Sequence, residues 1–65
     1  MNILVNAEPR DITADTLADA LSELGFDNPA IATALNGTFV PRQCRPTTRM
    51  NDGDRLEVLA PMQGG

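Results

Sequence analysis

Asn36-Gly37 is the strongest short-range folding signal in this sequence, because both residues tolerate the positive φ angles that a two-residue β-hairpin turn requires. Apolar and β-branched residues lie on both sides of this pair. We therefore expect residues 31–35 to form one strand and residues 38–40 to form the next. Pro41 ends the second strand, since it has no N–H to donate to a ladder.

The two ends of the sequence also have strand character. Residues 2–6 are rich in β-branched side chains, and the two-residue period of a strand places Ile3 on the core face. Residues 55–59 form the last expected strand, with Leu56 facing inward. Leu59 lies on the same strand with outward parity, so we assign it to a partner surface instead of the core.

A turn and a short return strand are expected after the first strand. Residues 7–10 are interpreted as the turn, because Pro9 is excluded from a central ladder. Residues 11–13 would then be the second strand and complete a hairpin.

One amphipathic helix is expected in the middle of the sequence. Asp15 or Thr16 can cap it, and Gly25 is well placed to end it. Its apolar residues recur at helical spacing: Leu17, Leu21 and Leu24.

Three acids on the same helix follow one another at i, i+4 and i+8: Asp15, Asp19 and Glu23. Such a row could hold a metal or a substrate, but it is more typical of a hydrated helix face. The first acids also interact favourably with the helix dipole. We expect a solvated face here.

The connection after Pro41 shows neither a strand nor a helix period. Prolines lie on either side of residues 42–45 and disfavour a helical turn, so residues 43–50 are expected to be an ordered, non-helical connection anchored by Met50. Residues 51–54 are interpreted as a tight turn, because the ligand spacing of a calcium loop is absent.

These elements give the order β-β-α-β-β-β in a chain of 65 residues, which is enough for one small domain. The fold class is α+β, with a mixed five-stranded sheet packed on one helix. The helix lies between the first and last strands and provides a crossover. Those two strands can therefore pair in parallel at the centre of the sheet.

A chain of this composition is not expected to be an enzyme on its own. It has no histidine to act as a base near neutral pH, and its single serine, Ser22, has no base to activate it. One cysteine, Cys44, can form no internal disulfide and cannot hold zinc or an iron–sulfur cluster. A reducing cytoplasm suits such a chain.

Charge and hydropathy argue against two further classes of partner. The net charge is −4 and the five basic residues are arginines without a basic run, so nucleic-acid binding is not expected. No apolar run approaches the length of a membrane span. The acidic balance would suit a basic partner surface.

The C-terminal residues have little to pack with. Pro61 breaks the last strand, and Met62 and Gln63 separate it from the terminal Gly64-Gly65. We expect residues 1–60 to form the domain and residues 61–65 to form a flexible tail. Two terminal glycines are slim enough to thread a narrow channel and place an α-carboxylate beside a catalytic group. A frayed terminus or a cloning remnant is the alternative.

The whole sequence resembles the ubiquitin-like β-grasp family, and within it the bacterial sulfur carriers of the ThiS type. The resemblance is carried by short segments in the same order: Ile3-Leu4-Val5-Asn6, the helix over 17–25, Ala34-Leu35-Asn36-Gly37, Val40-Pro41-Arg42, Asp52-Gly53-Asp54 with Leu56 and Val58, and Gly64-Gly65.

The resemblance implies a protein that carries sulfur for the thiazole ring of thiamine. A ThiF-like adenylyltransferase would use ATP and magnesium to activate the Gly65 carboxylate, while the carrier itself binds no cofactor and no metal. A sulfur donor such as a cysteine desulfurase would leave a thiocarboxylate, and a ThiG-like thiazole synthase would take the sulfur. Partner binding and presentation of the tail fall to Leu59, Met62, Gln63 and Gly64. The free carrier is expected to be a monomer.

Three other functions stay open at this point. A MoaD-type carrier for molybdenum cofactor synthesis would share the fold and the thiocarboxylate. A ubiquitin-like modifier would form isopeptide bonds, although the absence of lysine means that the chain cannot be linked to its own side chains. A simple binding module would make the glycines incidental. Cys44 could act as a sulfur relay, but the sequence offers no base to form its thiolate.

Overall fold

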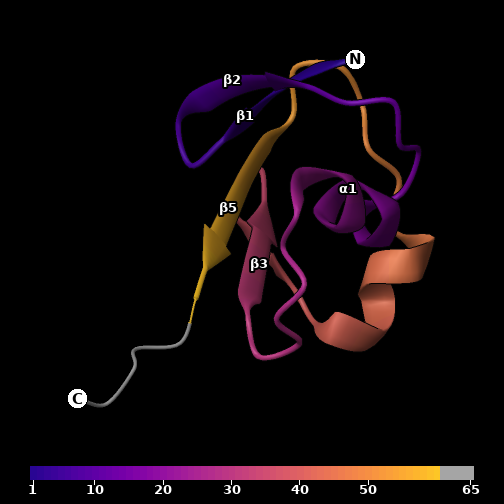
Figure 1. The fold of residues 1–65 in the computed structure, drawn as a ribbon, viewed down its shortest axis with the longest axis vertical. Helices are drawn as coiled ribbons and strands as arrows, with labels where there is room; N and C mark the ends of the chain where they lie inside the picture. Colours follow the sequence, from indigo (N-terminus) through magenta and orange to yellow (C-terminus); the bar gives the residue numbers. More distant parts are fainter. Residues whose placement is uncertain (61–65) are drawn as a thin grey trace.

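The computed structural model describes residues 1–60, so the expected tail at 61–65 lies outside the described residues. The described elements are, in order, β1 (Asn2–Val5), β2 (Glu8–Asp11), α1 (Leu17–Leu24), β3 (Ala32–Leu35), β4 (Thr38–Val40), the 3-10 helix η1 (Arg42–Thr47) and β5 (Arg55–Leu59) (Figure 1). The expected order of five strands and one α-helix is confirmed, and η1 is an addition to it.

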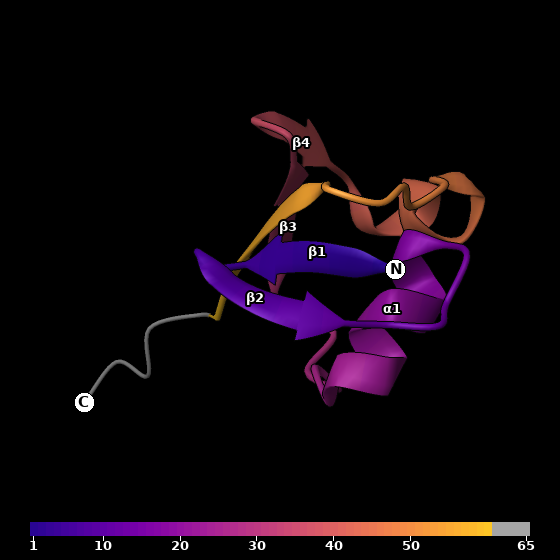
Figure 2. The ribbon, with the colours of Figure 1, turned by 90° about the horizontal axis from the view of Figure 1, so that it is seen from above.

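The five strands form one mixed sheet in the order β2-β1-β5-β3-β4. β1 and β5 pair in parallel at its centre, as expected, and the other neighbours are antiparallel. α1 and η1 lie on the same side of this sheet, as two views at right angles show (Figures 1 and 2). The sheet therefore has a covered inner face and an opposite outer face.

The hydrophobic core fills the space between α1 and the inner face. Its largest fully buried side chains come from both layers and from the segments between them: Ile3, Ile12, Leu17, Leu56 and Thr33. Met50 is also buried, which confirms that it anchors the connection before β5. Alternate residues of β1 and β5 are buried, so the expected inward parity of these strands is correct.

Both hairpins turn through two residues with positive φ. Asn36 (φ 52°) and Gly37 (φ 83°) form the expected turn between β3 and β4. Asn6 (φ 50°) and Ala7 (φ 70°) form an equivalent turn between β1 and β2. The prediction of a turn over residues 7–10 was wrong because alanine rarely adopts positive φ, so Asn6-Ala7 gives no recognisable turn signal.

The second strand consequently begins earlier than expected, at Glu8 instead of residue 11. Pro9 lies inside it, which is possible because β2 is the edge of the sheet. Pro9 is opposite Leu4, whose N–H donates to the Asp54 carbonyl on the other side of β1. The pair therefore needs no hydrogen bond between β1 and β2, and the missing N–H of proline costs nothing there.

The ends of α1 follow their sequence signals. The Thr16 hydroxyl accepts a hydrogen bond from the Asp19 N–H at 3.2 Å, and Gly25 ends the helix with φ 87°. The acid row was expected to be a solvated helix face, but its last acid, Glu23, makes hydrogen bonds within the protein. The Glu23 carboxylate accepts hydrogen bonds from the N–H groups of Thr13 and Ala14, all at 3.0 Å, and thereby fastens the segment that leads into the helix.

The connection after β4 corrects another prediction, because residues 42–47 form η1 despite their prolines. Pro41 precedes the helix, where an N–H would have no intrahelical partner. Pro46 lies inside it, and the carbonyl that its missing N–H would bond in a 3-10 helix belongs to Gln43, an exposed residue. Proline is costly in a long α-helix, but a short 3-10 helix at the surface has few backbone hydrogen bonds to lose. The hydroxyl groups of Thr47 (3.2 Å) and Thr48 (2.7 Å) add hydrogen bonds to the Cys44 carbonyl in the last turn.

We expect Leu21→Ala to lower the free energy of unfolding by about 2–3 kcal/mol, in the lower half of the usual range for such a change. Leu21 is buried in the core, but it also borders an open hollow beside η1, into which neighbouring atoms can relax. Urea denaturation measures the loss. Ser22→Ala, at the exposed neighbouring position, is the control and should shift stability by less than about 0.5 kcal/mol. An unchanged midpoint in Leu21→Ala would mean that this face of α1 does not form the core.

Candidate functional site

The expected site lies at the end of β5, where the described chain reaches Ala60. Met62, Gln63, Gly64 and Gly65, four of the five expected site residues, follow this point and lie outside the described residues. Leu59 is the fifth, and the structure places it as expected. It is the last residue of β5, and it is 71% exposed on the outer face of the sheet.

Leu59 belongs to a larger set of apolar side chains on the outer face. The alternation of buried and exposed residues along the strands assigns them to this face. The three exposed large hydrophobic residues among residues 1–60 are all members of the set: Leu4, Phe39 (64% exposed) and Leu59. Small and charged residues lie between them in the strand register: Ala32, Ala34, Arg55 and Glu57.

The register shows how this outer face is built. Leu59 is beside Ala32, and Phe39 is beside Ala34, which in turn is beside Glu57. Because the side chains of these alanines are short, the larger side chains beside them project further from the sheet. Exposed apolar side chains gathered on one face are a feature of surfaces that dock another protein. The sequence analysis found Leu59 but missed Leu4 and Phe39, although the same strand parity could have identified them.

A hollow of about 460 Å³ opens beside the outer face, where the β1–β2 turn approaches β5. Leu4, Asn6, Ala7, Arg55, Leu56 and Glu57 line it. Its lining residues include both apolar and polar or charged types.

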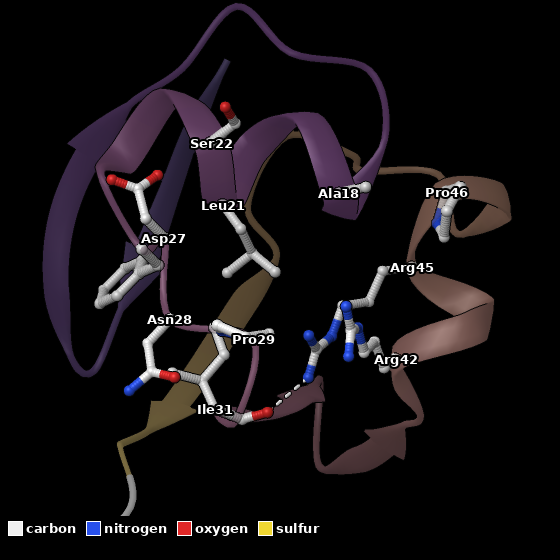
Figure 3. A pocket seen from close by; sticks show the side chains of 11 residues that line it. Ala18, Leu21, Ser22, Asp27, Asn28, Pro29, Ile31, Arg42, Arg45 and Pro46 are labelled. Atoms are coloured by element: carbon white, nitrogen blue, oxygen red, sulfur yellow. Dashed lines mark hydrogen bonds between the residues drawn. The ribbon is translucent and has the colours of Figure 1, made fainter.

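A second hollow, of about 360 Å³, lies on the other side of the molecule between α1, η1 and the segment before β3 (Figure 3). Arg45 projects into it and is only 7% exposed. Its guanidinium donates to the Ile31 carbonyl at 2.6 Å (dashed in Figure 3) and to the Thr33 hydroxyl at 3.1 Å. Both acceptors are neutral groups at the start of β3, so Arg45 ties η1 to the sheet and has a structural role.

The described residues hold no constellation suited to catalysis. Among residues 1–60, no group of three or more histidine, cysteine, aspartate or glutamate side chains could hold a metal ion. Cys44 and Ser22 are both exposed, and the sequence contains no histidine to activate either of them. No helix within this range is both long and apolar enough to cross a membrane.

The arrangement suits a protein that presents its chain end to another protein. β1 and β3 flank β5 at the centre of the sheet, and in the sequence β5 leads directly to the C-terminal residues. The outer face beside that point provides an apolar docking surface.

Comparison with known proteins gives one consistent result. Residues 3–65 match the ThiS family. The sulfur carrier protein ThiS of Thermus thermophilus is 36% identical over 63 residues, which are 97% of this chain and 98% of that protein. A thiazole synthase of Paramagnetospirillum magneticum is 36% identical over 66 residues, which cover 100% of this chain and 20% of that protein. This chain thus spans about a fifth of the length of that enzyme.

A solved structure supports the same relationship. The crystal structure of the thiamine biosynthesis protein ThiS from Geobacter metallireducens superposes with a TM-score of 0.83, at 32% sequence identity, and 100% of both chains is covered. The fold expected from the sequence resemblance is therefore correct.

Proposed function

The chain belongs to the ThiS family, and on this premise we propose that it is the sulfur carrier for the thiazole ring of thiamine, with Gly65 as the residue that bears the sulfur. The observation that carries the proposal is the match to a named sulfur carrier over nearly the whole length of both proteins. The family model, the named carrier, the thiazole synthase and the solved structure favour the thiamine branch over a role in molybdenum cofactor synthesis.

The proposed chemistry has two steps at the Gly65 carboxylate. A carboxylate oxygen first attacks the α-phosphate of ATP, releasing pyrophosphate and leaving an acyl-adenylate. Hydrosulfide can then attack the acyl carbon and expel AMP, which leaves a thiocarboxylate. If the donor is a persulfide, the attack expels AMP and leaves an acyl disulfide, and a second thiol must reduce its S–S bond to release the thiocarboxylate. A free carboxylate is a poor electrophile, and adenylation gives it a good leaving group. The carrier contributes positioning, which is compatible with its lack of a histidine base.

Three partners follow from this chemistry. An adenylyltransferase resembling ThiF would activate Gly65 with ATP and magnesium, and a sulfur donor such as a cysteine desulfurase would supply the sulfur. A thiazole synthase resembling ThiG would accept it. The similarity to a segment of a thiazole synthase supports the last pairing, because there a related segment and the enzyme are one polypeptide. The exposed free thiol of Cys44 suits a reducing cytoplasm as the place of action.

Intact-mass measurement tests the proposal. The full chain is incubated with ATP, magnesium, sulfide and a ThiF-like adenylyltransferase. We expect a mass gain equal to the replacement of one oxygen by sulfur, located on Gly65 by fragmentation. Omission of ATP is the control and should abolish the gain. An unchanged mass with an adenylyltransferase that activates another carrier would contradict the proposal.

We expect Leu59→Ala to raise the KM for the carrier in this reaction roughly fivefold to tenfold, because truncating a well-buried interface residue costs about 1 kcal/mol or more. Leu59 is the most exposed large hydrophobic residue among residues 1–60 and lies two residues before the expected tail. Pyrophosphate release at varied carrier concentration measures the change. Pro46→Ala is the control, since it trims an exposed apolar residue on η1, away from the outer face. Equal KM values for both variants would remove the outer face from the docking surface.

A further inference from the structure

β5 continues past the end of its parallel neighbour, and this leaves part of its edge without a strand partner. β1 ends at Val5, whereas β5 continues to Leu59. The last backbone bond between them runs from the Asn6 N–H to the Leu56 carbonyl, at 2.9 Å. Beyond it, the N–H and carbonyl of Val58 face the side from which β1 has turned away.

The side chain of Asn6 takes the place of the missing strand. Its Oδ1 accepts a hydrogen bond from the Val58 N–H at 2.8 Å, and its Nδ2 donates to the Val58 carbonyl at 3.2 Å. In a regular parallel ladder the main-chain carbonyl of residue 6 would accept from Val58. With φ at 50° that carbonyl is part of the turn, and the carboxamide supplies both an acceptor and a donor instead.

The position demands asparagine for two reasons at once. The turn requires positive φ, which asparagine tolerates better than other residues with a Cβ. The Val58 peptide group requires a donor and an acceptor at the reach of a short side chain. Aspartate would lose the donor and place a carboxylate against the Val58 carbonyl, and glycine would keep the turn and lose both hydrogen bonds.

We propose that Asn6 is a positioning residue for activation of the C-terminus, because its carboxamide fixes the end of β5 and thereby the point from which the C-terminal residues depart. The inference rests on the proposed function. Leu59 is held on its other side by pairing with Ala32, so Asn6 completes the support of β5 next to the docking surface. An adenylyltransferase that docks on the outer face then meets the chain end at a defined place.

The structure contains a matched control at the opposite end of β5. Asn36 also lies in a hairpin turn with positive φ (52°), and its Oδ1 accepts a hydrogen bond from the Arg55 N–H at 2.9 Å. Its Nδ2 donates to Asp54 at 3.0 Å. Asn6→Gly and Asn36→Gly therefore remove the same side chain from the same kind of turn and release the same strand, one at its end and the other at its start.

The test compares the kinetics of adenylation for the full-length variants, with pyrophosphate release as the signal. For Asn6→Gly we expect kcat to fall roughly tenfold while KM stays within about twofold, because docking is retained and delivery of the chain end is impaired. Asn6→Asp should behave in the same way. For Asn36→Gly both constants should stay within about twofold of the wild type. Equal kcat values in Asn6→Gly and Asn36→Gly would overturn the inference.

Hydrogen exchange supplies a readout that does not require the partner enzyme. The Val58 amide should exchange about fivefold faster in Asn6→Gly, whereas Asn36→Gly should accelerate exchange at Arg55 and leave Val58 unchanged. Unaltered exchange at Val58 in Asn6→Gly would show that the carboxamide does not hold the strand. Failure of the wild type to be adenylated would instead refute the proposed function. The two failures are therefore distinguishable.

Discussion

Deletion of Gly65 is expected to abolish ATP-dependent activation and leave the fold intact. The deletion leaves Gly64 with a free carboxylate, so the chemical group is preserved and only its position changes. One extended residue spans about 3.3–3.6 Å, and a displacement of about 1 Å can already cost roughly 100-fold in rate. We therefore expect at least a 100-fold loss of pyrophosphate release in the presence of the adenylyltransferase.

The same sample gives the control for this deletion. The hydrogen bonds and buried side chains of the fold described above belong to residues 1–60, so the thermal midpoint should not change. Ser22→Ala, which keeps the length of the chain and changes an exposed residue on α1, should retain the wild-type activity. If the shortened chain were activated as fast as the wild type, Gly65 would not be the acceptor and the assignment of the site would be wrong.

Local signals in the sequence were sufficient for much of the fold. Asn36-Gly37, Gly25 and a cap at Asp15 or Thr16 each satisfy a backbone requirement that few residues can meet, so these positions were predictable, and the structure selects Thr16 as the cap. The parity of β5 was equally clear, because Leu56 and Leu59 lie on opposite faces of one strand. The parity of β5 also assigned Leu59 to the outer face, and Leu59 is the expected site residue that lies within residues 1–60.

The incorrect predictions have tertiary causes. Ala7 adopts φ 70° because the pairing of β1 with β2 holds it there, and its own propensity gives no hint of this. Pro9 is tolerated because β2 happens to be an edge, which depends on the order of all five strands. The helix η1 forms where Arg45 meets acceptors near β3, far away in the sequence. Partners of this kind cannot be read from a local pattern.

Polar residues that hydrogen-bond turns to distant segments were missed for the same reason. Asp54 is 7% exposed, and its carboxylate accepts hydrogen bonds from the Asn51 N–H at 2.7 Å and from the Asn36 side chain at 3.0 Å. The sequence indicates a turn at this point but not that the turn docks against a second turn. Asn6 was likewise assigned to the first strand, and its bond to Val58 spans 52 positions in sequence. Side chains that connect turns to β5 were therefore visible only in the structure.

Leu56 and Leu59 allow stability and docking to be separated within one strand. Leu56 is 1% exposed on the inner face, between β1 and β3, so we expect Leu56→Ala to cost about 2–5 kcal/mol through lost burial and the cavity that remains. A domain of this size has a total stability of only roughly 3–10 kcal/mol. The thermal midpoint should fall by ~10–30 °C as a result.

Leu59→Ala is the matched variant, because it makes the same chemical change three residues further along β5 at a side chain that is 71% exposed. It should change stability by less than about 0.5 kcal/mol and raise only the KM for the carrier. Leu56→Ala, assayed well below its midpoint, should keep the wild-type KM. Urea denaturation and pyrophosphate release on the same two proteins measure both effects. Comparable stability losses in the two variants would mean that both faces of β5 are covered, and the outer face could then not serve as the docking surface of a free carrier.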